Sequence, residues 1–257
     1  MSIRVAKPNG AQTSTIERST TANKRTKQPS EEIKHGGVTV VIPARNEAKN
    51  ICDVIEGALQ VCDELIVVDG HSTDGTRDLA ADYGLRVVLD NKKGKGDAIR
   101  VGAEAATHNI VVFMDADGSH DPEDIPFLTE PIKQRKADLV IGSRGRGGSD
   151  ELHGDVEKLL RMVGSDLILI GINLRWKQKL TDSQNGFRAI RKDVICELGL
   201  TENITTIEQE MTMKCLKKGF VVGEVPAHEY ARKNGSSTIS LRRVWFRYIY
   251  SFIKNLI

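Results

Sequence analysis

Short apolar runs alternate with amphipathic stretches along the chain from Val38 onward. Short apolar runs are typical of buried strands, and apolar residues three or four positions apart are typical of helices. Strands are predicted at residues 38–42, 65–68, 86–89, 110–114 and 139–141. Helices are predicted between them at residues 48–59, 76–83, 96–106 and 123–134. This alternation predicts an α/β fold with a mostly parallel central sheet and helices on both of its faces.

A polar cluster follows each of the predicted strands. The clusters are residues 43–47, 69–75, 94–98, 115–117 and 142–144. Parallel α/β sheets bind their ligands beyond the carboxyl ends of the strands. The clusters therefore predict the rim of one binding site.

The sequence Asp115-Ala116-Asp117 directly follows a buried apolar run. Side chains two positions apart on an extended segment point the same way, so the two carboxylates converge and repel each other unless a cation lies between them. Mg²⁺ or Mn²⁺, which binds carboxylates together with substrate phosphates, suits such a pair. A solvated acidic turn is the alternative, because Asp and Gly are ordinary turn residues.

The charge of the chain is nearly balanced, with 37 Lys and Arg against 35 Asp and Glu. Residues 1–36 are polar and basic without apolar periodicity, which predicts a disordered basic tail. The remainder is slightly acidic, which argues against a nucleic-acid partner. The cysteines lack metal-site spacing, as expected of reduced thiols in a cytoplasmic protein. No apolar run is long enough to predict a membrane-spanning helix.

Eight short motifs carry a family resemblance. In order they are PARNE, VDGHSTDGT, GKGDA, MDAD, IGSR, TDSQNGFRAIR, IEQEM and EVP. With these motifs the chain resembles inverting GT-A glycosyltransferases of the family-2 type over residues 38–238, and is similar to their dolichol- or polyprenyl-phosphate mannosyltransferase branch. The resemblance implies a GT-A nucleotide-diphospho-sugar transferase domain at residues 37–238.

The resemblance also implies roles for the polar strand ends. Asp115 and Asp117 would hold Mg²⁺ or Mn²⁺ against the diphosphate of a GDP- or UDP-hexose. Asp69 would recognise the nucleotide base. The other implied donor-binding residues are Pro43, Arg45, Glu47, Lys95, Ala116 and Arg232. His120, which follows the Asp pair, is expected to be a solvent-facing loop residue rather than a ligand.

The sequence leaves two classes of acceptor open. Arg144 and Arg161 match positions that contact the acceptor phosphate in the polyprenyl-phosphate relatives, and a phosphate acceptor needs no deprotonation. A hydroxyl acceptor needs a general base, and the available carboxylates are Asp182, Glu208 and Glu210. The residues expected to be catalytic are Asp117, Arg144, Asp182 and Glu210. The apolar residues 164–174 fit either a core helix or an isoprenoid-facing groove.

Residues 239–257 predict a basic amphipathic helix. One arc of this helix carries Arg243, Arg247, Ser251 and Lys254. Another arc carries Leu241, Trp245, Tyr248, Ile249, Phe252 and Leu256. Such a helix suits a membrane surface, and packing against its own domain or a second subunit is the alternative.

Together these features predict a metal-dependent inverting glycosyltransferase that transfers a hexose from a nucleotide sugar to a dolichyl or undecaprenyl phosphate. The enzyme is expected to be a peripheral protein at the cytoplasmic face of a membrane. A membrane protein is a further candidate partner. A relative that glycosylates a hydroxyl of a soluble or cell-envelope acceptor is the first alternative. A sugar nucleotidyltransferase is disfavoured because PARNE replaces its glycine-rich loop, and a non-catalytic binding module is disfavoured because Asp115 and Asp117 are intact.

Overall fold

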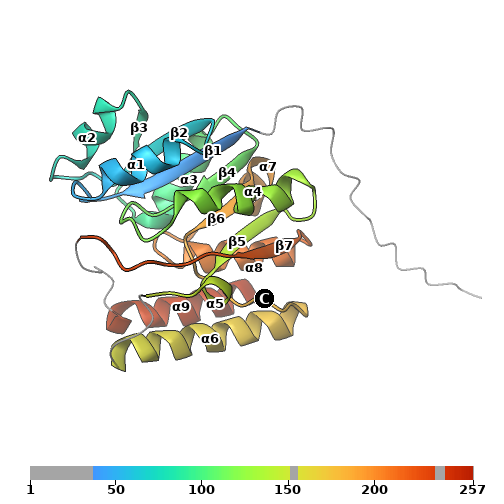
Figure 1. Cartoon of the computed structure of the whole chain (residues 1–257). Coiled ribbons are helices and arrows are strands. Elements are labelled where there is room, and N and C mark those ends of the chain that lie inside the picture. The colour runs from blue at the N-terminus through green and yellow to red at the C-terminus, as the bar shows by residue number, and fades with distance from the viewer. Residues whose placement is uncertain (1–36, 151–155, 235–240, 257) are drawn as a thin grey trace, which may run out of the picture. The chain divides into compact units, whose positions relative to one another are not determined.

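A computed structural model describes residues 37–150, 156–234 and 241–256, without the side chains of residues 156–161 and 241–245. Residues 1–36, for which a basic tail was predicted, lie outside the described residues. Figure 1 shows a central sheet with helices on both faces and, beside it, the two long helices α6 and α9. The predicted α/β architecture is confirmed.

Seven strands form one sheet in the order β3-β2-β1-β4-β6-β5-β7. Their bounds are β1 Val38–Ala44, β2 Glu64–Asp69, β3 Arg86–Leu89, β4 Ile110–Phe113, β5 Leu139–Ser143, β6 Arg188–Arg191 and β7 Val222–Pro226. Neighbouring strands are parallel except around β6, which runs antiparallel to β4 and to β5. Strands β1 to β5 match the predicted ones. Strand β6 escaped prediction because Arg188 and Arg191 interrupt its apolar pattern.

Helices cover both faces of the sheet. Their bounds are α1 Ile51–Leu59, α2 Thr76–Asp82, α3 Lys95–Ala105, α4 Ile125–Lys133, α5 Arg144–Gly147, α6 Val156–Trp176, α7 Lys192–Leu198, α8 Ile207–Lys217 and α9 Leu241–Leu256, with a 3₁₀ turn at Pro122–Asp124. Val40 and Ile42 of β1 share one apolar cluster with α1 and α4, whereas Val41 shares another with α3, α7 and α8. Successive side chains of a strand point to opposite faces, so β1 is buried on both sides.

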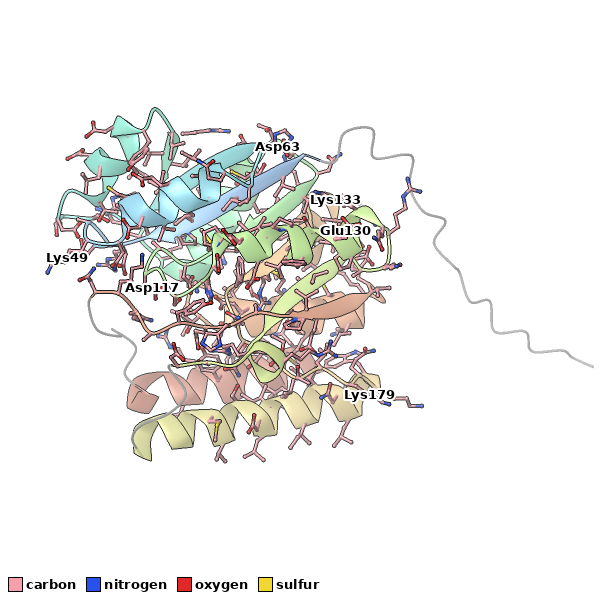
Figure 2. All side chains as sticks on the ribbon, viewed as in Figure 1. Lys49, Asp63, Asp117, Glu130, Lys133 and Lys179 are labelled. Atoms are coloured by element: carbon pink, nitrogen blue, oxygen red, sulfur yellow. The ribbon has the colours of Figure 1, made fainter. Side chains whose placement is uncertain are left out.

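The parallel strands bring their carboxyl ends to one edge of the sheet. Figure 2 shows Asp117, which follows β4, on the same side of the molecule as Lys49, which follows β1. Asp63, which precedes β2, lies toward the opposite end. The polar clusters after β1, β2 and β4 therefore meet at one edge, as a parallel α/β sheet requires of a binding site.

A third apolar cluster joins α6 and α9 to α8. Tyr248, Phe252 and Leu256 of α9 pack in this cluster with Ile172 of α6. Ser251, predicted on the basic arc, is fully buried, so the predicted orientation of α9 is wrong in this respect. The inner face of α9 packs against its own domain, which was the alternative interpretation. Among the described helices, none has the length and apolar character needed to cross a bilayer.

The packing of α3 on β1 requires a glycine at position 102. A Cβ atom there would lie 2.3 Å from Val41 Cγ1. We expect Gly102→Ala to lower the free energy of unfolding by about 1–3 kcal/mol, the usual cost of overpacking a core. Gly164→Ala is the matched control, since a Cβ on that α6 residue meets nothing within 4 Å. Urea denaturation checks both variants, and equal stabilities of the two would contradict the close packing.

Candidate active site

A cavity of about 790 Å³ opens at the carboxyl edge of the sheet. Eight of the predicted site residues line it, namely Pro43, Arg45, Glu47, Lys95, Asp115, Ala116, Asp117 and Arg232. They come from the end of β1, from the segments that follow β1, β4 and β7, and from the start of α3. The predicted convergence of these segments on one site is therefore seen in the structure.

The loop after β2 holds the loop after β1 in place. The backbone N–H groups of Asn46 and Glu47 donate to Ser72 Oγ at 2.9 Å and to Thr76 Oγ1 at 2.8 Å. Asn46 Oδ1 in turn accepts the N–H of Thr73 at 2.9 Å. Asn46 has a φ of 57°, a left-handed conformation that Asn tolerates better than most residues. The motif VDGHSTDGT thus positions PARNE at the cavity.

Asp69 does not reach the cavity. Its side chain is fully buried, and both of its carboxylate oxygens lie 3.2 Å from the N–H of Ser72, which donates to them. Gly70 and His71 line the cavity in its place. The prediction that Asp69 contacts the nucleotide base is not supported by this geometry, because the carboxylate is used to shape the turn.

Basic side chains neutralise the two aspartates that follow β4. Lys95 Nζ lies 2.6 Å from Asp115 Oδ1 and 3.0 Å from Glu208 Oε1. Arg232 lies 3.2 Å from Asp117 Oδ2, and Ser119 donates to Asp117 Oδ1 through its hydroxyl at 2.7 Å. These contacts relieve the repulsion that the Asp-x-Asp spacing predicts.

The pKa values follow from these contacts. Burial alone would raise the pKa of Asp115, but the ammonium of Lys95 outweighs it and holds that pKa far below the usual range. Burial would lower the pKa of Lys95, and the charges of Asp115 and Glu208 raise it instead. Asp115 and Lys95 are therefore both ionised at neutral pH.

The donor set fits a hard divalent cation. Among the described residues, no group of three or more His, Cys, Asp or Glu side chains is arranged to hold a metal ion. Mg²⁺ and Mn²⁺ need few protein ligands, because they keep waters and bind substrate phosphates. Asp115, whose side chain is 29% exposed, and Asp117 supply two carboxylates at the cavity wall. A cation there would replace Lys95 on Asp115 and Arg232 on Asp117.

His120 is not the solvent-facing residue that was expected. Its side chain is 1% exposed, and its ring stacks on Phe187 with 4.9 Å between centroids. His120 Nε2 lies 3.8 Å from Asp115 Oδ2. The imidazole therefore borders the Asp pair from within the protein.

Asp182 does not act as a free carboxylate. Arg144 donates to it from Nε at 2.7 Å and from Nη2 at 3.1 Å, and the N–H groups of Gln184 and Asn185 donate at 2.9 and 3.1 Å. Burial would raise the pKa of Asp182, but these contacts, led by Arg144, lower it. The predicted role as a general base is not supported, and Asp182 instead fixes the guanidinium of Arg144.

Glu210 is likewise used within the fold. Its carboxylate accepts the N–H groups of Thr201 and Glu202 and pairs with Lys214 at 2.7 Å. It is fully buried and is not among the described cavity-lining residues. The predicted catalytic role of Glu210 is therefore not supported by this geometry.

Two further predictions concern acceptor binding. Arg144 pairs with Glu229 at 3.5 Å as well as with Asp182, so two carboxylates offset its charge. Arg161 belongs to α6, but its side chain lies outside the described part. The cavity is also lined by His71 of the predicted rim cluster 69–75 and by Arg247, which was predicted on the basic arc of the C-terminal helix. The structure adds cavity residues that the sequence did not single out, namely Asp90, Lys92, Ile204 and Thr205.

The shared position of Lys95 gives a prediction for metal binding. We expect Lys95→Met to tighten Mn²⁺ binding about tenfold, because a cation that competes for Asp115 with a charge-assisted contact is removed. Glu208→Gln should instead weaken Mn²⁺ binding, because Lys95 then has Asp115 as its remaining partner and competes more strongly for it. Electron paramagnetic resonance of free Mn²⁺ measures both effects.

Lys218→Met controls for net charge, because Lys218 pairs with Glu197 at 3.7 Å and does not line the cavity. Arg232→Met provides an independent check on Asp117 and should also tighten Mn²⁺ binding. Unchanged or weaker binding in both Lys95→Met and Arg232→Met would contradict the competition.

The sequence is similar to that of known glycosyltransferases. A sequence model described as glycosyl transferase family 2 matches residues 39–199. Glycosyltransferase AglJ of Haloferax volcanii is 35% identical over 210 residues, which are 78% of this chain and 65% of that protein. A dolichol-phosphate mannosyltransferase of Pyrococcus furiosus is 34% identical over 232 residues, 84% of this chain and 64% of its own. The chain thus spans slightly less than two thirds of these two relatives.

Solved structures show the same fold. Glucosyl-3-phosphoglycerate synthase of Mycobacterium tuberculosis, in complex with Mg²⁺ and uridine diphosphate, aligns with a TM-score of 0.69 at 22% identity, over 86% of this chain and 79% of that one. A complex of the same enzyme with Mn²⁺, uridine diphosphate and phosphoglyceric acid aligns with a TM-score of 0.67, over 86% of this chain and 78% of that one.

Another sequence relative is covered over most of its length. This uncharacterized glycosyltransferase of M. tuberculosis is 31% identical over 204 residues, 79% of this chain and 89% of that protein. The chain therefore belongs to glycosyl transferase family 2 and has the GT-A fold.

Proposed function

We propose that the enzyme transfers a hexose from a nucleoside diphosphate sugar to a polyprenyl phosphate at a membrane surface. The observation that carries this proposal is an outward apolar face on α6 and α9, which lie side by side (Figure 1). Its exposed side chains are Val163, Leu167, Ile170 and Leu174 of α6 and Phe246, Ile249, Tyr250 and Ile253 of α9. Their spacing of three or four residues makes one stripe on each helix.

The charge of α9 favours a lipid over a second copy of the chain as the partner of this apolar face. Helix α9 contains four basic residues and no acidic residue. Two copies that met through the same face would bring these cations together, whereas anionic headgroups would attract them. We assign the attachment to the cytoplasmic face, because all four cysteines are free thiols.

The donor side of the reaction follows from the cavity. We assign Asp115 and Asp117 to Mg²⁺ or Mn²⁺, and Lys95 and Arg232 to the diphosphate oxygens. The ion, when bound, would neutralise the negative charge that develops on the departing diphosphate. The solved synthase complexes contain this kind of ion together with uridine diphosphate, which supports the assignment.

The acceptor side needs no proton acceptor. A phosphate monoester is mostly dianionic at neutral pH, and one of its oxygens can bond to the anomeric carbon as the bond to the nucleoside diphosphate breaks. Asp182 and Glu210 are each held by several donors and Glu208 pairs with Lys95, which favours a phosphate over a hydroxyl acceptor. The similarity to a dolichol-phosphate mannosyltransferase supports the same choice.

The metal assignment predicts the effect of Asp117→Asn. An amide cannot neutralise the cation, so turnover of the nucleotide sugar should fall about 100-fold or more, as when one preorganised electrostatic group is removed. Asp53→Asn is the control, since Asp53 is exposed and pairs with Lys233. Chelator should abolish turnover by the parent enzyme, and Mn²⁺ should restore it. Full activity in excess chelator would overturn the assignment.

The membrane assignment predicts the effect of charges on the apolar face. Leu167→Glu combined with Ile253→Glu should reduce binding to anionic vesicles at least tenfold, because each large apolar side chain contributes about 1.5–3 kcal/mol when buried. Phe127→Glu is the control, because Phe127 is an equally exposed apolar residue on α4. Co-sedimentation measures vesicle binding, and sedimentation velocity measures oligomeric state. A parent dimer that the double substitution dissociates, without vesicle binding, would show that a second copy covers the face.

A further inference from the structure

Helix α9 forms part of the cavity wall as well as part of the apolar face. Arg247 lines the same cavity as Asp115 and Asp117. The residue before it, Phe246, and Tyr250 one turn later are 65% and 67% exposed and belong to the apolar face. Arg247 therefore lies where the cavity and the apolar face meet.

Hydrogen bonds fix this turn of α9 to the cavity. The hydroxyl of Tyr248 donates to Thr205 Oγ1 at 2.8 Å and lies 3.2 Å from the Thr205 carbonyl oxygen. Gln209 Nε2 donates to the backbone oxygen of Tyr248 at 3.2 Å. Thr205 itself lines the cavity. The position of Arg247 at the cavity is thus set by packed neighbours rather than by its own side chain.

The guanidinium of Arg247 is available to a ligand. In the part of the chain that the structure describes, it makes no hydrogen bond or ion pair, whereas Lys95 is shared by two carboxylates and Arg144 by two others. Arg45 and Lys92 also line the cavity, but they follow β1 and β3, whereas α9 packs on α6 and α8. Among these cations, Arg247 is the one on an element that carries the apolar face.

We propose that Arg247 binds the phosphate of the lipid acceptor. This inference rests on the proposed function and adds a residue to it. A polyprenyl phosphate whose chain lies against the apolar face can present only its phosphate to the cavity. Arg247 at the boundary can meet a phosphate with two parallel N–H donors, which makes Arg well suited to this group. The phosphate would then approach the sugar held near Asp115 and Asp117.

Steady-state kinetics in detergent micelles tests the proposal without a membrane-binding step. For Arg247→Ala, we expect the KM for a polyprenyl phosphate to rise about tenfold or more, the change for one lost charge-assisted contact. The KM for the nucleotide sugar should stay close to the parental value. Arg247→Lys should recover part of the loss, because it keeps the charge but not the paired donors.

Lys254→Ala is the matched control on the same helix. Lys254 is also basic and exposed, but it pairs with Glu202 at 3.3 Å and does not line the cavity. It should leave the acceptor KM in micelles unchanged. A general loss of charge attraction would instead affect both variants equally, which would overturn the proposal.

A short, water-soluble isoprenyl phosphate separates phosphate recognition from lipid packing. Arg247→Ala should raise the KM for this acceptor too, by a factor similar to that in micelles. A rise in the donor KM alone would assign Arg247 to the diphosphate and overturn the inference while the proposed function stands. If the parent enzyme uses neither acceptor, the proposed function and the inference both fail.

Discussion

The site depends on the neutralisation of two carboxylates that one strand end forces together. Asp115 and Asp117 follow β4 with a single residue between them, and like charges this close disfavour ionisation unless cations lie beside them. Lys95 and Arg232 supply those cations in the structure. One begins α3 and the other follows β7, so only the assembled sheet brings all four side chains together. The same electrostatic demand makes the pair a natural place for a divalent ion.

A buried charge network lies behind this pair. Glu208 is 1% exposed and contacts Lys95, and the fully buried Arg188 donates to the backbone oxygens of Glu208 and Asn185. Burial lowers the pKa of Arg188, and the nearby carboxylates of Glu208 and Asp182 oppose that effect. Removing one member of such a network would leave an uncompensated buried charge. We therefore infer that the acidic residues of this network hold neighbouring side chains in position and do not transfer protons.

Sequence patterns predicted the sheet and the location of the site well, since buried strands such as β4 are continuously apolar and parallel strands share a binding edge. They failed where a residue's partner decides its role. Asp182 and Glu210 were expected to be catalytic. In the structure, Asp182 pairs with Arg144 and Glu210 pairs with Lys214. Strand β6 was not predicted because it contains the fully buried Arg188, and a buried cation is rare in a strand.

The helical wheel of α9 likewise described an amphipathic helix but not which side its neighbours cover. Ser251 faces inward and Phe246 outward, the reverse of what polarity alone suggests. The contribution of Arg247 to the cavity also depends on tertiary packing, since α9 and β4 are far apart in sequence. No spacing along the chain could reveal it.

The identity of the reaction product tests the proposed reaction most directly. The full chain, Mn²⁺ and a panel of UDP- and GDP-hexoses would be incubated with polyprenyl phosphate, and lipid products analysed by mass spectrometry with determination of the anomeric configuration. We expect a polyprenyl phosphate hexose with inverted configuration, formed in equal amount with the nucleoside diphosphate. Transfer to a soluble hydroxyl acceptor such as phosphoglycerate, with no lipid product from any donor, would contradict the proposed reaction.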